Sequence, residues 1–389
     1  MKNWKNILRT GLAASFIAAS ATATSAQDQG ITDDTILLGE VLPLTGAAAV
    51  GALALSAGHK LAVMEQNEAG GLHGRMIEIV REDDGYVVPR GVQGVRKMLT
   101  SEKVFAMLVT SNTAVSAATV DMLTDLGIPT MNYLSFPEVF FEPVKDNIFV
   151  GGASHKDTTI ALMKMMNEEY PGKKWAIVTG DSELGFQMRE GIEPASEEYG
   201  IEVVYNETYR TGQKDFSAEV LAANEAGAEI LFAGGIVSEN IAMVKEMERL
   251  GNDGPVVLSW IGRYAPQFLA PMGEAVKNVH MVDFVVADES EEGKAFMEKA
   301  AQYLDESDMK KVNRFSMVGY ASTKVLLNAI GECSDLTWTC VNDALEATKD
   351  FEVGVMSPIS YGPDSHFSNQ ELRLMRVNPE TLNYFPIGE

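Results

Sequence analysis

A short polar turn in the middle of the chain has the residue types of a small-anion site. It reads Thr110-Ser111-Asn112-Thr113 and separates an apolar stretch over 104–109 from a helical pattern over 114–126. At the start of a helix the first N–H groups are unpaired and the helix dipole is positive, which suits a carboxylate. The same residue types are also common N-caps, so ligand binding and helix capping both stay open for Ser111, Asn112 and Thr113.

The elements around this turn alternate between apolar strands and amphipathic helices, which predicts parallel sheets covered by helices on both faces. Gly127 ends the helix, and a second apolar run closes a βαβ unit at Leu134-Ser135-Phe136. An irregular passage over 137–152 separates two such series, so we expect two α/β lobes. The expected strands are 35–41, 76–80, 104–109, 174–178, 202–205, 230–235 and 255–260, and the expected helices are 53–68, 89–101, 114–126, 156–169 and 186–199.

The N-terminal residues 1–26 have the pattern of a signal peptide. A basic start with Lys2, Lys5 and Arg9 precedes an apolar stretch over 7–19, which is too short to span a bilayer. Small residues then lead to an expected cleavage after Ala26. The pattern predicts an exported, periplasmic protein, with a retained membrane anchor as the alternative.

The charge balance argues against a nucleic-acid partner. The chain has 31 Lys and Arg against 55 Asp and Glu, and removal of the three basic residues in 1–26 leaves 28 against 55, a net charge of −27. Phosphate binding needs a basic surface, so we expect no nucleic acid to bind. Positive charge for a small anion must therefore be local, from a helix end or a single arginine.

The two cysteines and five histidines suggest a disulfide and no metal site. Cys333 and Cys340 lie seven residues apart, which in an oxidising compartment is most simply one disulfide, with two buried thiols as the alternative. The histidines are scattered and show no ligand spacing. We expect neither a metal nor another cofactor.

An ordered set of short motifs resembles the periplasmic leucine/isoleucine/valine-binding protein family, the type I solute-binding proteins of ABC importers. The set extends from residue 35 to about residue 361, and its order and spacing are more specific than any single motif. The motifs are Pro43-Leu44-Thr45-Gly46, Asn67-Glu68-Ala69-Gly70-Gly71-Leu72-His73-Gly74-Arg75, Gly127-Ile128-Pro129, Thr211-Gly212-Gln213-Lys214-Asp215-Phe216 and Gly234-Gly235.

The resemblance implies two doubly wound parallel-sheet lobes joined by three hinge crossings, near Val150, Val285 and Val353. The N-lobe is then 27–150 plus 286–353, and the C-lobe is 151–285 plus 354–389. A monomer of this kind binds its ligand in the cleft between the lobes, closes on it, and delivers it to an inner-membrane ABC permease. The general rule for open α/β sheets also places the site at the carboxyl ends of the strands.

The resemblance also implies a set of site residues. The hydroxyl and N–H of Thr113 would hold the ligand carboxylate, beside backbone contacts from Leu134, Ser135 and Phe136. Arg263 is a further partner for a ligand carboxylate, or else a solvated surface residue. The positions matched in the C-lobe are Asp181, Leu184, Phe186, Ile236, Trp260 and Arg263.

One departure from the family pattern bears on the ligand. Amino-acid binders of the family hold the ligand ammonium with an acidic residue, and Ile261 stands at that position here. A buried ammonium without a counter-charge is costly. We therefore expect a branched-chain or other hydrophobic amino acid or a related small carboxylate, and as alternatives an aromatic carboxylate, a short amide or a urea-like ligand.

Two other classes of function compete with transport. Gly180-Asp181-Ser182 is similar to the nucleophile block of a hydrolase class, but it lies in mid-chain and lacks the Asp-x-x-His partner, so we expect no enzyme. A ligand-sensing receptor module would need a membrane span or a cytoplasmic location, and no second long apolar run follows residue 26.

Overall fold

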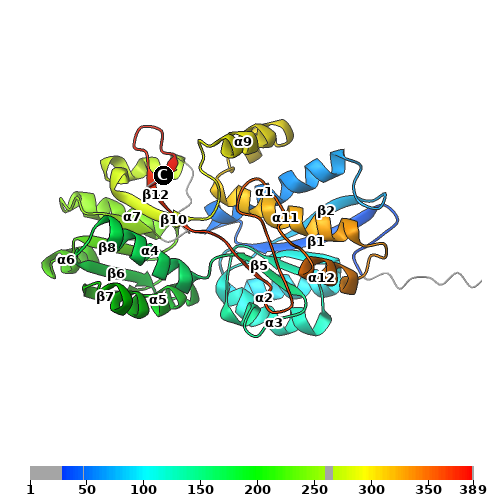
Figure 1. The fold of residues 1–389 in the computed structure, drawn as a ribbon, viewed down its shortest axis with the longest axis horizontal. Coiled ribbons are helices and arrows are strands. Elements are labelled where there is room, and N and C mark those ends of the chain that lie inside the picture. The colour runs from blue at the N-terminus through cyan, green and yellow to red at the C-terminus, as the bar shows by residue number, and fades with distance from the viewer. Residues whose placement is uncertain (1–28, 47, 259–265, 388–389) are drawn as a thin grey trace, which may run out of the picture.

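The chain forms two sheets, each in its own lobe, that lie side by side (Figure 1). The computed structural model describes residues 29–46, 48–258 and 266–387. The predicted signal peptide therefore lies outside the described residues. Within the described residues, no helix is both long and apolar enough to cross a membrane.

The first sheet has six strands in the order β11-β5-β4-β3-β1-β2. All of its pairings are parallel. The central strands β3, β4 and β5 are buried along their whole length, which is the pattern of a sheet covered on both faces. Its strands are β1 (Thr35–Leu42), β2 (Met76–Asp83), β3 (Ala106–Thr110), β4 (Thr130–Asn132), β5 (Ile148–Gly152) and β11 (Phe367–Asn369).

The second sheet has seven strands in the order β13-β12-β10-β9-β8-β6-β7. Its first five strands in chain order pair in parallel, whereas β12 and β13 are antiparallel additions at one edge. The expected parallel α/β architecture is therefore confirmed for the bulk of both sheets. The strands are β6 (Trp175–Gly180), β7 (Val203–Tyr209), β8 (Ile230–Gly234), β9 (Val256–Leu258), β10 (Val279–Asp283), β12 (Arg373–Val377) and β13 (Tyr384–Pro386).

Helices cover both sheets. The first lobe carries α1 (Ala49–Glu68), α2 (Val88–Lys97), η1 (Met98–Glu102), α3 (Thr113–Leu126), η2 (Glu138–Phe140), α9 (Glu291–Tyr303), α10 (Glu306–Met309), α11 (Arg314–Glu332) and α12 (Trp338–Glu346). The second lobe carries α4 (His155–Glu169), α5 (Glu183–Tyr199), α6 (Ser217–Glu225), α7 (Val237–Arg249), α8 (Pro266–Leu269) and η4 (Ala270–Asn278).

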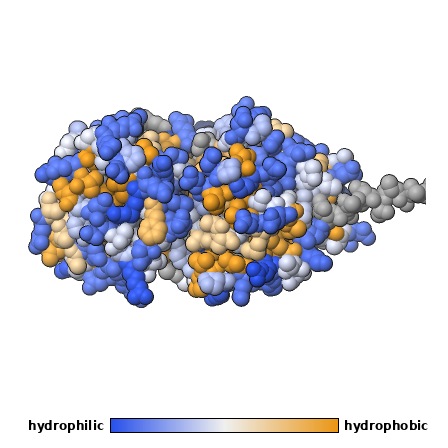
Figure 2. All heavy atoms as spheres, turned by 90° about the horizontal axis from the view of Figure 1, so that it is seen from below, coloured by the Kyte–Doolittle hydropathy of each residue, from blue (hydrophilic) through white to orange (hydrophobic). Residues whose placement is uncertain are grey.

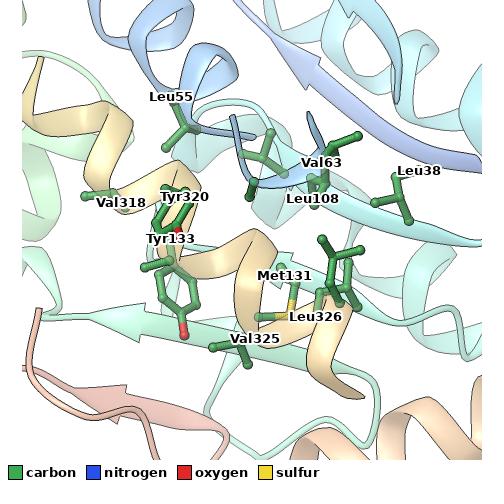
Figure 3. Packing of buried hydrophobic residues seen from close by; sticks show 14 of the residues in the cluster. Leu38, Leu55, Val63, Leu108, Met131, Tyr133, Val318, Tyr320, Val325 and Leu326 are labelled. Atoms are coloured by element: carbon green, nitrogen blue, oxygen red, sulfur yellow. The ribbon is translucent and has the colours of Figure 1, made fainter. Parts of the chain in front are cut away.

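The core of the first lobe is built around α1 and α11. Residues of α11 such as Val318 and Leu326 pack toward the strands that carry Leu38 and Leu108 (Figure 3). The two helices touch closely because Gly58 has no side chain; a Cβ there would lie 2.0 Å from the carbonyl oxygen of Ser316. This contact lies in the middle of α1 and in the first turn of α11.

The chain crosses between the lobes three times. β5 belongs to the first sheet and α4 to the second lobe, so one crossing lies between them. An isolated bridge joins Val285 to Met356, and a second crossing lies at this bridge. The third does not fall near Val353. β11 pairs with β5, and Met356, Ile359 and Tyr361 pack in the first core, so the chain stays with the first lobe until β11. We place the last crossing between β11 and β12, and the C-lobe segment begins there rather than at residue 354.

The disulfide between Cys333 and Cys340 is present, as predicted. It joins the residue that follows α11 to the first turn of α12. On the face shown in Figure 2, hydrophilic side chains predominate and apolar side chains gather in patches on both halves. The disulfide lies at the opposite end of α11 from Phe315, and so away from the site described next.

Candidate ligand-binding site

A cavity of about 80 Å³ lies between the lobes and is lined by residues of both. On this measure one water needs roughly 10–15 Å³, so the space holds several waters or a small organic molecule. Val50 and Tyr86 of the first lobe pack against core residues of the second, so the lobes are in contact around it. The lining residues are Pro43, Ala48, Gly51, Ala52, Tyr86, Asn112, Thr113, Leu134, Ser135, His155, Leu184, Ile236, Val237 and Phe315.

The N-terminus of α3 forms the polar end of this cavity. Asn112 is the N-cap, and its side-chain oxygen accepts from the N–H groups of Ala114 at 3.1 Å and Val115 at 3.2 Å. The capping alternative is thus confirmed for Asn112. Among the described residues neither the N–H nor the hydroxyl of Thr113 has a hydrogen-bond partner, and Thr113 is 5% exposed. Thr113 therefore keeps two donors for a bound group.

A buried network of hydroxyl and amide groups holds this end of α3 in place. Ser116 Oγ lies 2.8 Å from Thr110 Oγ1 and 2.7 Å from Ser135 Oγ, and Asn132 Nδ2 donates to Ser135 Oγ at 3.0 Å. Asn132 Oδ1 accepts from the N–H groups of Leu134 and Ser135, both at 3.2 Å. Those two N–H groups are already committed, so a ligand can meet this segment through its carbonyl oxygens and side chains.

Ser111 supports the site without lining the cavity. It adopts a left-handed backbone conformation with φ of 70°, and its hydroxyl donates to the buried carboxylate of Asp84. Asp84 also accepts from the N–H of Tyr86 at 2.8 Å. Burial raises the pKa of Asp84, and the neighbouring Asp83 charge adds to this, against the lowering effect of Ser111. Ser111 thus orders the loop that carries Tyr86 into the cavity.

The second lobe contributes the apolar wall opposite α3. Leu184 lies in the first turn of α5, and Ile236 and Val237 lie where β8 gives way to α7. The buried Glu239 fixes this second turn, because its carboxylate accepts from the N–H of Ile236 at 3.0 Å and from the hydroxyl of Tyr209 at 2.6 Å. These turns at the starts of α5 and α7 face the N-terminus of α3 across the cavity.

Among the described residues, the lining of the cavity is neutral apart from the helix end. No charged side chain lines it within the part of the chain that the structure describes. Burial raises the pKa of Tyr86 to about 12, helped by the charges of Glu239 and Asp84, so its phenol stays protonated. Burial lowers the pKa of His155 to about 3, so its imidazole is neutral near pH 7. The lining thus offers neutral donors, a helix dipole and apolar surface.

Six of the predicted site residues meet at this cavity: Asn112, Thr113, Leu134, Ser135, Leu184 and Ile236. Three others lie elsewhere. Phe136 is buried with its ring against His155, behind the cavity wall. Asp181 is exposed and accepts from the N–H and hydroxyl of Thr211 at 2.7 and 3.0 Å. Phe186 is 50% exposed, because α5 begins at Glu183 and turns this position outward.

Two predicted residues, Trp260 and Arg263, lie outside the described residues, as does Ile261. The similarity of Gly180-Asp181-Ser182 to a hydrolase block has a structural explanation, because Ser182 is the N-cap of α5 and accepts from the N–H of Gly185 at 3.3 Å. No group of three or more His, Cys, Asp or Glu side chains is placed to hold a metal within the described ranges.

The sequence reasoning missed several lining residues. Tyr86 follows a run of acidic residues at the end of β2, and its position just after a strand end was the available signal. His155 begins α4 directly after the first crossing, which also points to the cleft. Gly51 and Phe315 had no signal in their own segments, because they meet only through the packing of α1 on α11.

A sequence profile of the family described as periplasmic binding protein matches residues 35–381. Among curated proteins, the Leu/Ile/Val-binding protein homolog 7 of Brucella abortus strain 2308 is 24% identical over 373 residues, which cover 92% of this chain and 91% of that protein. Both comparisons span nearly the whole described chain.

Two solved structures share the fold. A branched chain amino acid ABC transporter protein from Thermus thermophilus with bound valine has a TM-score of 0.82 at 19% identity, covering 92% of this chain and 97% of that one. A solute binding protein of an ABC transporter from R. palustris, in complex with 4-hydroxybenzoate, has a TM-score of 0.80 at 18% identity, covering 91% and 96%. The same fold thus accompanies an aliphatic amino acid in one protein and an aromatic carboxylate in another.

Proposed function

Since the chain belongs to the periplasmic binding protein family, we propose that it is the solute-binding component of an ABC importer and captures a small carboxylate with a short apolar body. This family is a class of binding proteins rather than enzymes. The observation that carries the proposal is the interlobe cavity, where the first turn of α3 meets the apolar turns of α5 and α7.

The carboxylate is assigned to the N-terminus of α3. Thr113 supplies an N–H and a hydroxyl, and the aligned peptide dipoles supply partial positive charge. Hydrogen bonds to an ionised group are stronger than neutral ones, and here they would form away from bulk water. A neutral lining is compatible with a single negative charge that the helix end stabilises.

The remaining lining sets the size and polarity of the ligand body. Leu134, Leu184, Ile236 and Phe315 offer hydrocarbon surface, and about 80 Å³ of space accommodates a short aliphatic chain or a small ring. A long acyl chain would not fit this cavity in the described conformation.

The α-ammonium group decides between an amino acid and a simple carboxylate. Both kinds of ligand occur among the structures named above: valine is an amino acid, and 4-hydroxybenzoate is a carboxylate without an ammonium. No carboxylate of the described residues lines the cavity. Asp84 and Glu239, whose charges act on Tyr86, are buried and hydrogen-bonded to partners of their own. We therefore favour a ligand without an ammonium at that position.

Capture would proceed by closure of the two lobes about the three crossings. A ligand that touches Thr113 on one side and Leu184 on the other makes its full set of contacts only in the closed form, so binding populates that form. The closed protein would then deliver the ligand to an inner-membrane permease. Export to the periplasm, directed by residues 1–26, is part of the same proposal.

The sharpest test compares leucine with 4-methylpentanoate, which has the same carbon skeleton and lacks only the ammonium. Isothermal calorimetry on the purified mature protein should show 4-methylpentanoate binding at least as tightly as leucine, with 4-methylpentanamide and benzoate extending the series. Binding of leucine alone would contradict the preference for a simple carboxylate. Binding of none of the four, in calorimetry and in thermal shift, would contradict the ligand class.

A further inference from the structure

A second interlobe compartment lies beside the ligand cavity. Its volume is about 350 Å³, and His155 lines both spaces. The ring of Phe136 packs against that of His155, with centroids 5.5 Å apart, and Phe136 also lines the second compartment. The Phe136–His155 pair therefore stands between the two spaces.

The two walls of this compartment differ in chemistry. The first lobe supplies a mainly apolar wall made of Ala117, Phe136, Pro137, Val139 and Phe141, with Glu138 as its one charged residue. Val139 is 43% exposed, so part of this wall is open to solvent. Two of its members are aromatic, and aromatic ring faces attract cations as well as hydrocarbon.

The second lobe supplies an acidic wall. Asp157, Glu183 and Glu190 lie on α4 and α5, and Lys156 is the one basic residue of the lining within the described residues. Asp157 and Glu183 occupy first helical turns, where each helix dipole stabilises one negative charge. Glu190 lies beyond the first turn and makes no ion pair with a described residue.

The side-chain oxygen of a buried glutamine on the same wall accepts no hydrogen bond from the described residues. Gln187 is 9% exposed, and its Nε2 donates to Glu183 Oε1 at 3.4 Å. Its Oε1 is buried and has no hydrogen-bond partner among the described residues. An unpaired buried acceptor is costly, so this group favours an occupant that donates a hydrogen bond. Glu183 and Glu190, one turn to either side on α5, favour an occupant that is positively charged.

We propose that this compartment binds an alkylammonium group. Its hydrocarbon part would lie on the wall of Phe136 and Val139, and its ammonium would donate to Gln187 Oε1 and to the carboxylates of Glu183 and Glu190. Three donors on one ammonium match three acceptors on one helix face. Such an occupant touches both lobes and so stabilises their closed arrangement.

The ammonium can come from two sources. It is either the distal end of the ligand held at Thr113, in which case this inference rests on the proposed function, or part of a separate amine. The probes n-pentylammonium, hexanoate and 6-aminohexanoate distinguish these sources, because they carry the amine alone, the carboxylate alone and both together.

Calorimetry of the three probes on the full mature chain tests the proposal. The variant E183Q/E190Q removes both charges and keeps similar side-chain shape, and E193Q is the matched control, an exposed glutamate of α5 that does not line the compartment. We expect E183Q/E190Q to lower one of two quantities by at least about tenfold. These are the affinity for n-pentylammonium and the ratio of the affinities for 6-aminohexanoate and hexanoate. The same affinities measured for E193Q should stay within about twofold of those of the unmodified protein.

The two sources of the ammonium predict different results. Binding of n-pentylammonium identifies a separate amine, and an advantage of 6-aminohexanoate that is also lost in Thr113→Ala identifies one ligand spanning both spaces. The inference is overturned if no amine-dependent binding appears, or if E183Q/E190Q and E193Q behave alike in proteins with unchanged circular dichroism. Hexanoate binding and its dependence on Thr113 report on the proposed function separately.

Discussion

Arg314 and Asp283 form a buried ion pair that joins the two lobes beside a hinge crossing. Arg314 opens α11 in the first lobe, Asp283 ends β10 in the second, and Arg314 Nε donates to Asp283 Oδ2 at 2.6 Å. The same guanidinium donates to Asp288 at 2.8 Å and to the carbonyl oxygen of Val285 at 3.1 Å. One side chain therefore holds the crossing that follows β10 against the first lobe.

We expect Asp283→Asn to lower the free energy of unfolding by about 3 kcal/mol, because it leaves a buried arginine partly uncompensated. Asparagine keeps an oxygen for the N–H groups of Phe284 and Val285, which Asp283 Oδ1 accepts at 2.7 and 3.2 Å. Urea unfolding followed by circular dichroism measures the change. Glu306→Gln removes a charge from an exposed pair with Lys310 and should cost less than about 0.5 kcal/mol. Equal effects of the two variants would contradict a structural role for the buried pair.

Thr113→Ala should weaken binding of the carboxylate ligand by at least about 1 kcal/mol, since it removes one of the two donors that Thr113 directs to the cavity. The fold should persist, because the N-cap Asn112 is unchanged. Calorimetry with the best ligand of the carboxylate series gives the affinity. Thr124→Ala, on an exposed position of the same helix, is the control and should leave it unchanged. Unaltered affinity in Thr113→Ala would remove this residue from the site.

The buried His155 predicts an acid-sensitive fold. Burial lowers its pKa from the ordinary 6.5 to about 3, so between these values the unfolded chain holds a proton that the folded chain does not. Stability therefore falls as the pH drops below 6.5, and rises with pH through this window. We expect the destabilisation caused by His155→Gln at pH 7.5 to shrink by about 1–2 kcal/mol at pH 5.0. A stability difference that stays constant between these two pH values would contradict the neutral, buried state.

Removal of the disulfide should cost about 2 kcal/mol of unfolding free energy, because the bond between Cys333 and Cys340 closes only a short loop. The double variant C333S/C340S, measured by urea unfolding, should match the unmodified protein in the presence of a reductant. Ligand affinity should be unaffected, since the bond lies at the far end of α11 from Phe315. A large loss of affinity without unfolding would show that the α11–α12 junction is coupled to the site.

Local sequence patterns were enough to predict most of the architecture. The strand over 35–41 appears as β1, and the helix over 114–126 as α3, because apolar periodicity and the stop at Gly127 act within single segments. The third crossing was misplaced for the opposite reason. β11 is a three-residue edge strand whose pairing with β5 depends on a partner more than two hundred residues away.

The chain's residue order alone determined that a hydroxyl-rich turn stands at the start of α3, where free N–H groups and a helix dipole favour an anion. Only the tertiary structure decided what surrounds that turn. Gly51, Tyr86, His155 and Phe315 are distant in sequence and become neighbours when the two lobes and the α1–α11 pair come together. A helix end depends on a few consecutive residues, whereas a cavity depends on long-range packing, and no local pattern records that packing.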